Sequence, residues 1–222
     1  CNALDVVDDH GRKILENVDL ELRRGEIYGL AGISGRGQRE LMETLFGLRA
    51  SGGGSITLSG NDVTRAGIDK RLGLGMAFIS EDPLRDNVVP GMSILEHMAL
   101  SGAPVKSKGF RIDWKAMREA LDREKVMREL GVPEVSRKLE TLSGGNVQRT
   151  VLARALIKSP SLLLASYPAR GLDIEIGRAH VRDVRFCWFP KTWENCMIYP
   201  TASASFPTTG FTAPWIPRRF PS

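Results

Sequence analysis

The residues with the clearest capacity for chemistry form the octapeptide 142–149, which reads Leu-Ser-Gly-Gly-Asn-Val-Gln-Arg. Ser143 is a favoured residue type for a helix N-cap, where its side-chain oxygen accepts from amides of the first turn. Gly144 and Gly145 would let a ligand approach the backbone closely. An apolar helical face follows as far as Pro160. The segment therefore predicts a helix whose N-terminal amides bind phosphate, with a merely flexible helix start as the structural alternative.

A second candidate phosphate site lies upstream, where a buried strand at 26–31 leads into a glycine-rich turn and then a helix. That order is the context of a P-loop, whose pattern is G-x-x-x-x-G-K-[ST]. The candidate residues here are Gly32, Gly35, Gly37, Gln38 and Arg39. Gln38 stands at the lysine position and Arg39 at the hydroxyl position, so the phosphate cation and the Mg²⁺ ligand are lost. Arg36 or Arg39 could replace part of the missing charge.

Together these motifs resemble those of ABC-type ATPases, in which the octapeptide is the signature motif. The resemblance covers about residues 4–173. It is strongest to the second nucleotide-binding domain of importer ATPases for simple sugars and nucleosides, whose phosphate loop often reads Gly-x-Gly-Gln-Arg-Glu-Leu, as residues 35–41 do here. It implies that the signature residues are Leu142, Ser143, Gly144, Gly145, Asn146 and Gln148. It also implies that Ser143, Gly144, Gly145 and the helix dipole complete an ATP site.

The positions that the family uses for hydrolysis are altered. Glu81 follows the strand at 76–80, where the family has a glutamine that contacts the metal and the attacking water; its carboxylate could bind Mg²⁺ or lie in a solvated loop. Ser166 and Tyr167 replace the family's Asp and Glu, while Asp173 ends the preserved frame Pro-x-x-Gly-Leu-Asp. A phenol, with a pKa of about 10, is a poor base at neutral pH. We therefore assign no catalytic residue to this chain and expect a specialised, non-hydrolysing site.

The resemblance also implies the fold class, an α/β P-loop NTPase of the ABC type. We expect antiparallel strands within 4–22, a mostly parallel core sheet and a helical subdomain at about 91–140. Within that subdomain Ser93 and Glu96 predict a capping box. Asp113 predicts a second cap, before an apolar stripe that begins at Trp114 and packs in the core. The glycine-rich segment 51–55 is interpreted as a flexible turn.

Domain organisation follows from where the resemblance stops. Residues 1–173 are predicted to form the nucleotide-binding domain. Residues 174–222 show no helical or strand period and are interpreted as a non-homologous tail, disordered or artefactual, which would leave the sheet without its last strands. The sequence starts at Cys1 rather than at a methionine, from which we expect a fragment of a longer protein.

Composition narrows the class of protein. The net charge of +5 lies largely in residues 174–222, and the nearly neutral remainder offers no electrostatic footprint for nucleic acid. No apolar run reaches the roughly 18 residues of a membrane span. The cysteines Cys1, Cys187 and Cys196 have no metal-like spacing, which fits a reducing compartment.

For function, the resemblance implies a domain that supplies the signature motif to a composite ATP site, with ATP and Mg²⁺ bound weakly or in a shared site. Hydrolysis coupled to transport would belong to the parent protein. The implied partners are a second nucleotide-binding domain and transmembrane permease subunits, at the cytoplasmic face of the plasma membrane. A non-catalytic nucleotide-sensing or scaffold domain and a non-transport ABC ATPase remain as alternatives.

Overall fold

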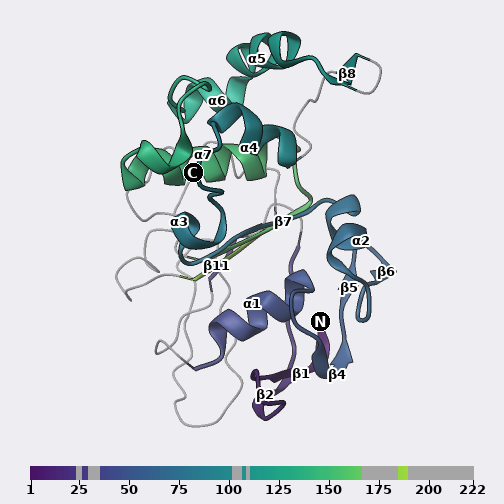
Figure 1. Ribbon diagram of the computed structural model, residues 1–222. Coiled ribbons are helices and arrows are strands. Elements are labelled where there is room, and N and C mark those ends of the chain that lie inside the picture. Colours follow the sequence, from purple (N-terminus) through teal and green to yellow (C-terminus); the bar gives the residue numbers. More distant parts are fainter. Residues whose placement is uncertain (24–26, 30–35, 102–106, 109–110, 167–184, 190–222) are drawn as a thin grey trace, which may run out of the picture. The chain divides into compact units, whose positions relative to one another are not determined.

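The computed structural model describes residues 1–23, 27–29, 36–101, 107–108, 111–166 and 185–189 (Figure 1). These residues fall into two compact units. The first unit holds the described residues up to Phe78, together with 161–166 and 185–189. The second unit holds the described residues of Ile79–Pro160. The helix that begins at the octapeptide belongs to the second unit, and the glycine-rich turn before residue 38 belongs to the first.

An antiparallel sheet at the start of the first unit has the strand order β2-β1-β4. Strands β1 (Asn2–Val7) and β2 (Lys13–Val18) form the antiparallel pair that the sequence predicts. Alternate side chains of β1 face inward, because successive residues of a strand point to opposite faces, and Leu4 and Val6 are fully buried.

Strand β4 (Ser51–Ser55) corrects the interpretation of 51–55 as a flexible turn, because it pairs antiparallel with β1. Its glycines allow the close pairing with β1 and do not indicate flexibility. A Cβ on Gly54, whose φ is +78°, would lie 2.1 Å from the carbonyl oxygen of Ala3. A Cβ on Gly52 would lie 2.8 Å from Val7 Cγ1. The neighbouring strand therefore approaches so closely that only glycine fits, which composition alone does not reveal.

A four-stranded sheet of the first unit has the order β3-β11-β10-β7. Its strands are β3 (Ile27–Gly29), β7 (Met76–Ile79), β10 (Leu162–Ser166) and β11 (Arg185–Phe189). Every residue of β10 is buried, as its continuous apolar run predicts. Strand β11 runs parallel to both β10 and β3, although the sequence analysis identifies no strand after residue 173. A five-residue strand with partners on both sides needs no recognisable period of its own.

Helix α1 (Gln38–Phe46) follows the glycine-rich turn, packs on β10 and ends as expected at Gly47, whose φ is +92° and whose amide donates to Glu43 and Thr44 carbonyl oxygens. The remaining elements of this unit are β5 (Thr57–Leu58), β6 (Asn61–Asp62) and α2 (Ile68–Gly73). The core includes Leu41, Met42, Leu45, Ile56, Val63, Met76, Leu162 and Leu164.

The second unit is mainly helical, as predicted for 91–140. Its elements are α3 (Pro83–Asp86), α4 (Ile94–Leu100), β8 (Ser107–Lys108), β9 (Arg111–Ile112), α5 (Trp114–Arg123), α6 (Lys125–Glu129), the 3₁₀ turn η1 (Leu139–Thr141) and α7 (Gly144–Leu156). Both α3 and α6 pack on α7 (Figure 1). Among the helices of the described residues, none is long and apolar enough to cross a membrane.

The capping predictions for this unit are confirmed. Ser93 and Glu96 form a complete capping box at α4, and the side chain of Asp113 accepts from the amide of Ala116 at α5. The stripe of α5 is buried at Met117 and Leu121, both 0% exposed, but the prediction for Trp114 is wrong, since it is 43% exposed. As the first residue of α5, Trp114 has no preceding turn to pack against.

Candidate functional site

The octapeptide starts helix α7 as predicted, with Ser143 at the N-cap in an extended conformation. The amide of Val147 donates to the carbonyl oxygen of Ser143 at 3.0 Å, which closes the first helical turn. The Ser143 side chain, in contrast, accepts no capping hydrogen bond, so this part of the expectation is wrong. Ser143 and Gly144 are exposed, and a Cβ on Gly144 would meet no atom within 4 Å. The helix start is therefore open to a ligand.

The interior face of the octapeptide anchors this open end. Leu142, Val147 and Gln148 are at most 8% exposed, and Val151 continues the buried face one turn later. The hydroxyl of Thr150 donates to the carbonyl oxygen of Asn146 at 2.8 Å. Gly145 and Asn146 are partly buried between the open end and the core. A buried face held along the helix fixes the direction in which its first-turn amides point, as binding of an anion requires.

On the phosphate-loop side, Gly32 and Gly35 lie outside the described residues. Gly37 is buried, with a φ of +97°, and forms the N-cap of α1. A Cβ there would lie 2.9 Å from Leu15 Cγ, so both the backbone conformation and the space require glycine. The amide of Leu41 donates to the Gly37 carbonyl oxygen at 2.9 Å. The glycine thus starts α1 in the way that the P-loop pattern predicts.

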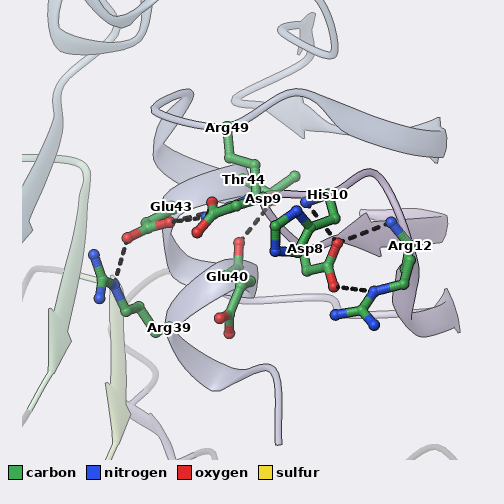
Figure 2. A network of polar contacts seen from close by, with 9 residues as sticks. All are labelled: Asp8, Asp9, His10, Arg12, Arg39, Glu40, Glu43, Thr44 and Arg49. Carbon is green, nitrogen blue, oxygen red and sulfur yellow. Dashed lines mark hydrogen bonds and ion pairs between the residues drawn. The ribbon is translucent and has the colours of Figure 1, made fainter. Parts of the chain in front are cut away.

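The two residues at the lysine and hydroxyl positions are engaged within their own helix and turn. Gln38 Oε1 accepts from the amide of Arg36 at 3.1 Å. Arg39 Nε donates to Glu43 Oε1 at 2.7 Å, so its guanidinium lies along α1, one turn further on (Figure 2). The sequence analysis missed Glu43, although the four-residue spacing from Arg39 on a helix is a recognisable signal for such a pair.

Glu43 joins a wider network that fastens α1 to the turn between β1 and β2 (Figure 2). Arg49 donates to Glu43 Oε2 through Nε at 3.1 Å, and its terminal nitrogen donates to Asp9 Oδ1 at 2.7 Å. Within the turn, the amide of Arg12 is the main cause that lowers the pKa of Asp8, and Arg12 Nε pairs with the same carboxylate at 2.8 Å. The network stabilises the helix that follows the phosphate loop.

The altered hydrolytic positions are divided between the units. Ser166 is the last residue of β10 in the first unit and is buried, while Tyr167 and Asp173 lie outside the described residues. Glu81, which follows β7, belongs to the second unit and is exposed. It precedes Asp82, the N-cap of α3. Within each unit the structure brings candidates together: α1 packs on β10, and α3 packs on α7.

Binding of Mg²⁺ by this chain requires side chains that can serve as its ligands. Over the ranges that the structure describes, no group of three or more His, Cys, Asp or Glu side chains could hold a metal ion. At the position of the usual hydroxyl ligand stands Arg39, a cation that would repel Mg²⁺. The described residues therefore do not form a complete magnesium site.

Known families and proteins resemble this chain over most of its length. The family model described as ABC transporter matches residues 15–169. The glucose import ATP-binding protein TsgD13 of Haloferax volcanii is 36% identical over 181 residues, which cover 77% of this chain and 32% of that protein. The xylose import ATP-binding protein XylG of Pseudomonas savastanoi pv. phaseolicola is 34% identical over 76% of this chain and 33% of its own length. The chain thus spans about a third of these curated relatives.

Solved structures show the same fold at lower sequence identity. The dimeric structure of a bacterial ABC transporter cassette has a TM-score of 0.69 and 20% identity, over 90% of this chain and 90% of that one. A dimeric cassette in a post-hydrolysis state, bound to ADP and phosphate, has a TM-score of 0.69 and 19% identity, over 90% of this chain and 89% of that one. The architecture is that of an ATP-binding cassette.

Proposed function

Because this chain belongs to the ABC transporter family, we propose that it is an ATP-binding domain of an importer for sugars or nucleosides and supplies the signature side of a composite ATP site. The names of two relatives, a glucose and a xylose import ATP-binding protein, support sugars as the class of substrate. The phosphate-loop sequence at 35–41, which matches the pattern frequent in importers for simple sugars and nucleosides, supports the same group.

The observation on which the proposal rests is the state of Ser143. Its hydroxyl is exposed at the start of α7 and is not used to cap the helix. The first-turn amides of a helix lack intrahelical acceptors and carry the positive end of the helix dipole. A hydroxyl and several amides that point from one open helix end are the groups that bind a terminal phosphate.

The phosphate-loop side supports the other half of the proposal. Gln38 brings no charge to the lysine position, and Arg39 is bound by Glu43. Ser166 and Tyr167 offer neither a carboxylate for the metal nor a base for water. We infer that the lysine, the metal-binding Asp and the catalytic Glu are contributed by a second nucleotide-binding domain of the parent protein, which holds ATP and Mg²⁺ against this signature helix.

The partner of such a domain would be a transmembrane permease at the cytoplasmic face of the membrane. In the proposed arrangement, closure of the two nucleotide-binding domains around ATP is passed to the permease through the segment 81–90 and the helical part of the second unit. Both lie in the same unit as the signature helix. Residues 1–173 are nearly neutral overall and so lack the excess of positive charge typical of proteins that bind nucleic acid, which argues against a role in translation or DNA repair.

The test is a Ser143→Ala variant of the complete parent protein, assembled with its permease. Loss of one hydrogen-bond donor to the developing charge lowers turnover by roughly 100-fold in comparable sites, so ATP hydrolysis and transport should both fall by about that factor. Thr141→Ala is the matched control, since it removes an exposed hydroxyl two residues earlier that bonds only the Lys138 carbonyl in the described structure. Unchanged hydrolysis in Ser143→Ala would refute the proposal and favour a nucleotide-sensing or scaffold domain.

A further inference from the structure

A partly buried arginine at the far end of the signature helix contacts the segment that follows Glu81. Arg154 lies in the last turn of α7, and its terminal nitrogen donates to the carbonyl oxygen of Asn87 at 3.2 Å. Burial lowers the pKa of Arg154. A charged group withdrawn from water is costly unless acceptors in the protein replace the lost water. The Asn87 carbonyl is such an acceptor, so the contact fixes where the Arg154 side chain lies.

Asn87 in turn closes the segment 80–87 into a compact loop. Its amide donates to the carbonyl oxygen of Pro83 at 2.9 Å and ends α3. Its side-chain Oδ1 accepts from the hydroxyl of Ser80 at 3.1 Å, and Ser80 is buried directly before Glu81. A short polar chain therefore runs from Ser80 through Asn87 to Arg154 on the signature helix.

Helix α3 depends on such external anchors. It has only four residues, and none of them is buried. Isolated helices of this length are unstable in water, because nucleation is costly and few hydrogen bonds follow. The packing of α3 on α7, with the Arg154 bond at its C-terminal end, therefore determines how the loop is held.

The other end of the same segment is attached just before the signature residues. The amide of Gly91 donates to Glu140 Oε2 at 3.0 Å, and the amide of Leu139 donates to the carbonyl oxygen of Met92 at 3.1 Å. Ser93 also forms a β-bridge with Lys138. The segment 80–93 is thus fastened to both ends of the signature region, at Arg154 and at 138–140.

We propose that Arg154 is a positioning residue that couples the segment 81–90 to the signature helix, so that a displacement of this segment by the permease moves Ser143 with it. The proposal rests on the proposed function, in which that segment receives the permease. Arg154 is the adjustable part of the attachment, because the hydrogen bond at this end comes from one side chain. At 138–140 a main-chain hydrogen bond and a β-bridge accompany the bond from the Gly91 amide to the Glu140 side chain.

The experiment compares Arg154→Met with Lys158→Met in the complete parent protein. Methionine keeps the aliphatic length of Arg154 and removes its donors, while Lys158 is an exposed cation just beyond the end of α7. We expect Arg154→Met to keep basal ATP hydrolysis within about two-fold and to lose most of the stimulation by the substrate-loaded permease. Its Tm should fall by a few degrees. Arg154→Lys, which restores one donor, should recover part of the stimulation, and Lys158→Met should match the unchanged protein.

Two results would overturn the inference: stimulation as in the unchanged protein, or a proportional fall in basal and stimulated hydrolysis, which would indicate a structural role alone. If Arg154→Met does not fold, Ser80→Ala removes the hydrogen bond at the other end of the series Ser80–Asn87–Arg154 and should also reduce stimulation selectively. Ser143→Ala measured alongside separates the two proposals. Intact hydrolysis in Ser143→Ala refutes the proposed function, whereas its loss, combined with normal stimulation in Arg154→Met, refutes only the coupling role.

Discussion

Arg71 in α2 offers the sharpest test of how the first unit is held together. It is 2% exposed, and within the described part of the chain its guanidinium donates to five main-chain carbonyl oxygens, at distances from 2.5 to 3.3 Å. The acceptors belong to Thr44, Leu45, Val63, Thr64 and Ala66. Two of these carbonyls, those of Thr44 and Leu45, lie in the last turn of α1, where a helix supplies few amide donors and Thr44 also accepts from Gly47. The side chain therefore caps α1 from outside and ties it to the segment 63–66.

The expected effect of Arg71→Met follows from these contacts. Hydrogen bonds that involve a charged group contribute about 1.5–3 kcal/mol each, so five would sum to roughly 10 kcal/mol. Removing the buried guanidinium also relieves its desolvation cost, which is several kcal/mol. We therefore expect the free energy of unfolding to fall by about 3–5 kcal/mol, because all five buried carbonyls lose the guanidinium as donor, and of these Thr44 and Val63 keep a backbone amide.

Urea unfolding, followed by circular dichroism, measures this change. With an m-value of about 2 kcal/mol/M, the midpoint should shift down by roughly 2 M. Lys70→Met is the matched control, since Lys70 is the preceding residue of the same helix, its side chain is exposed, and its loss should change stability by less than about 0.5 kcal/mol. A loss below about 1 kcal/mol in Arg71→Met would show that water or repacking satisfies the carbonyls, and the reasoning would fail.

Two further predictions concern pH and backbone conformation. The backbone amide of Ser93 and, to a smaller extent, its side chain lower the pKa of Glu96. The capping box therefore stabilises α4 fully at a pH above the ordinary carboxyl pKa. This contribution is lost as the pH falls through the lowered pKa of Glu96. Thermal melts at pH 7 and pH 3 should therefore show a smaller fall in Tm between the two pH values for Glu96→Gln than for the unchanged chain. Equal falls in Tm would contradict this role of Glu96. Gly54→Ala should destabilise the chain by more than about 3 kcal/mol in urea unfolding, through strain and the clash with Ala3, whereas Gly60→Ala, with φ +82° and open space, should lose only about 1 kcal/mol. Similar losses in both variants would exclude the clash.

Much of the local structure could be predicted because its causes are adjacent in the chain. The capping box of Ser93 and Glu96, the cap at Asp113 and the helix stop at Gly47 each depend on residues within one helical turn. The start of α7 at Ser143 belongs to the same class, and so does the continuous apolar run of β10. Signals of this kind already contain both partners of the interaction.

The candidate site was predictable in its location and not in its contacts. The octapeptide indicated the helix start, but whether the Ser143 hydroxyl caps the helix or is left for a ligand depends on side-chain geometry. The charge of Arg39 could be read from the sequence, whereas its pairing with Glu43, and the link from Glu43 through Arg49 to Asp9, required α1 and the turn between β1 and β2 to meet (Figure 2).

By itself, the sequence determined the family, the order of most elements and the place of the motifs proposed to bind phosphate, since these depend on residue type and short spacing. Tertiary structure alone decided that 51–55 is a strand, that 185–189 lies between β3 and β10, and that Arg71 bonds five carbonyls. Each of these depends on partners from distant segments: a glycine-rich strand is stabilised by the backbone beside it, and a buried charge by the acceptors that the fold collects around it.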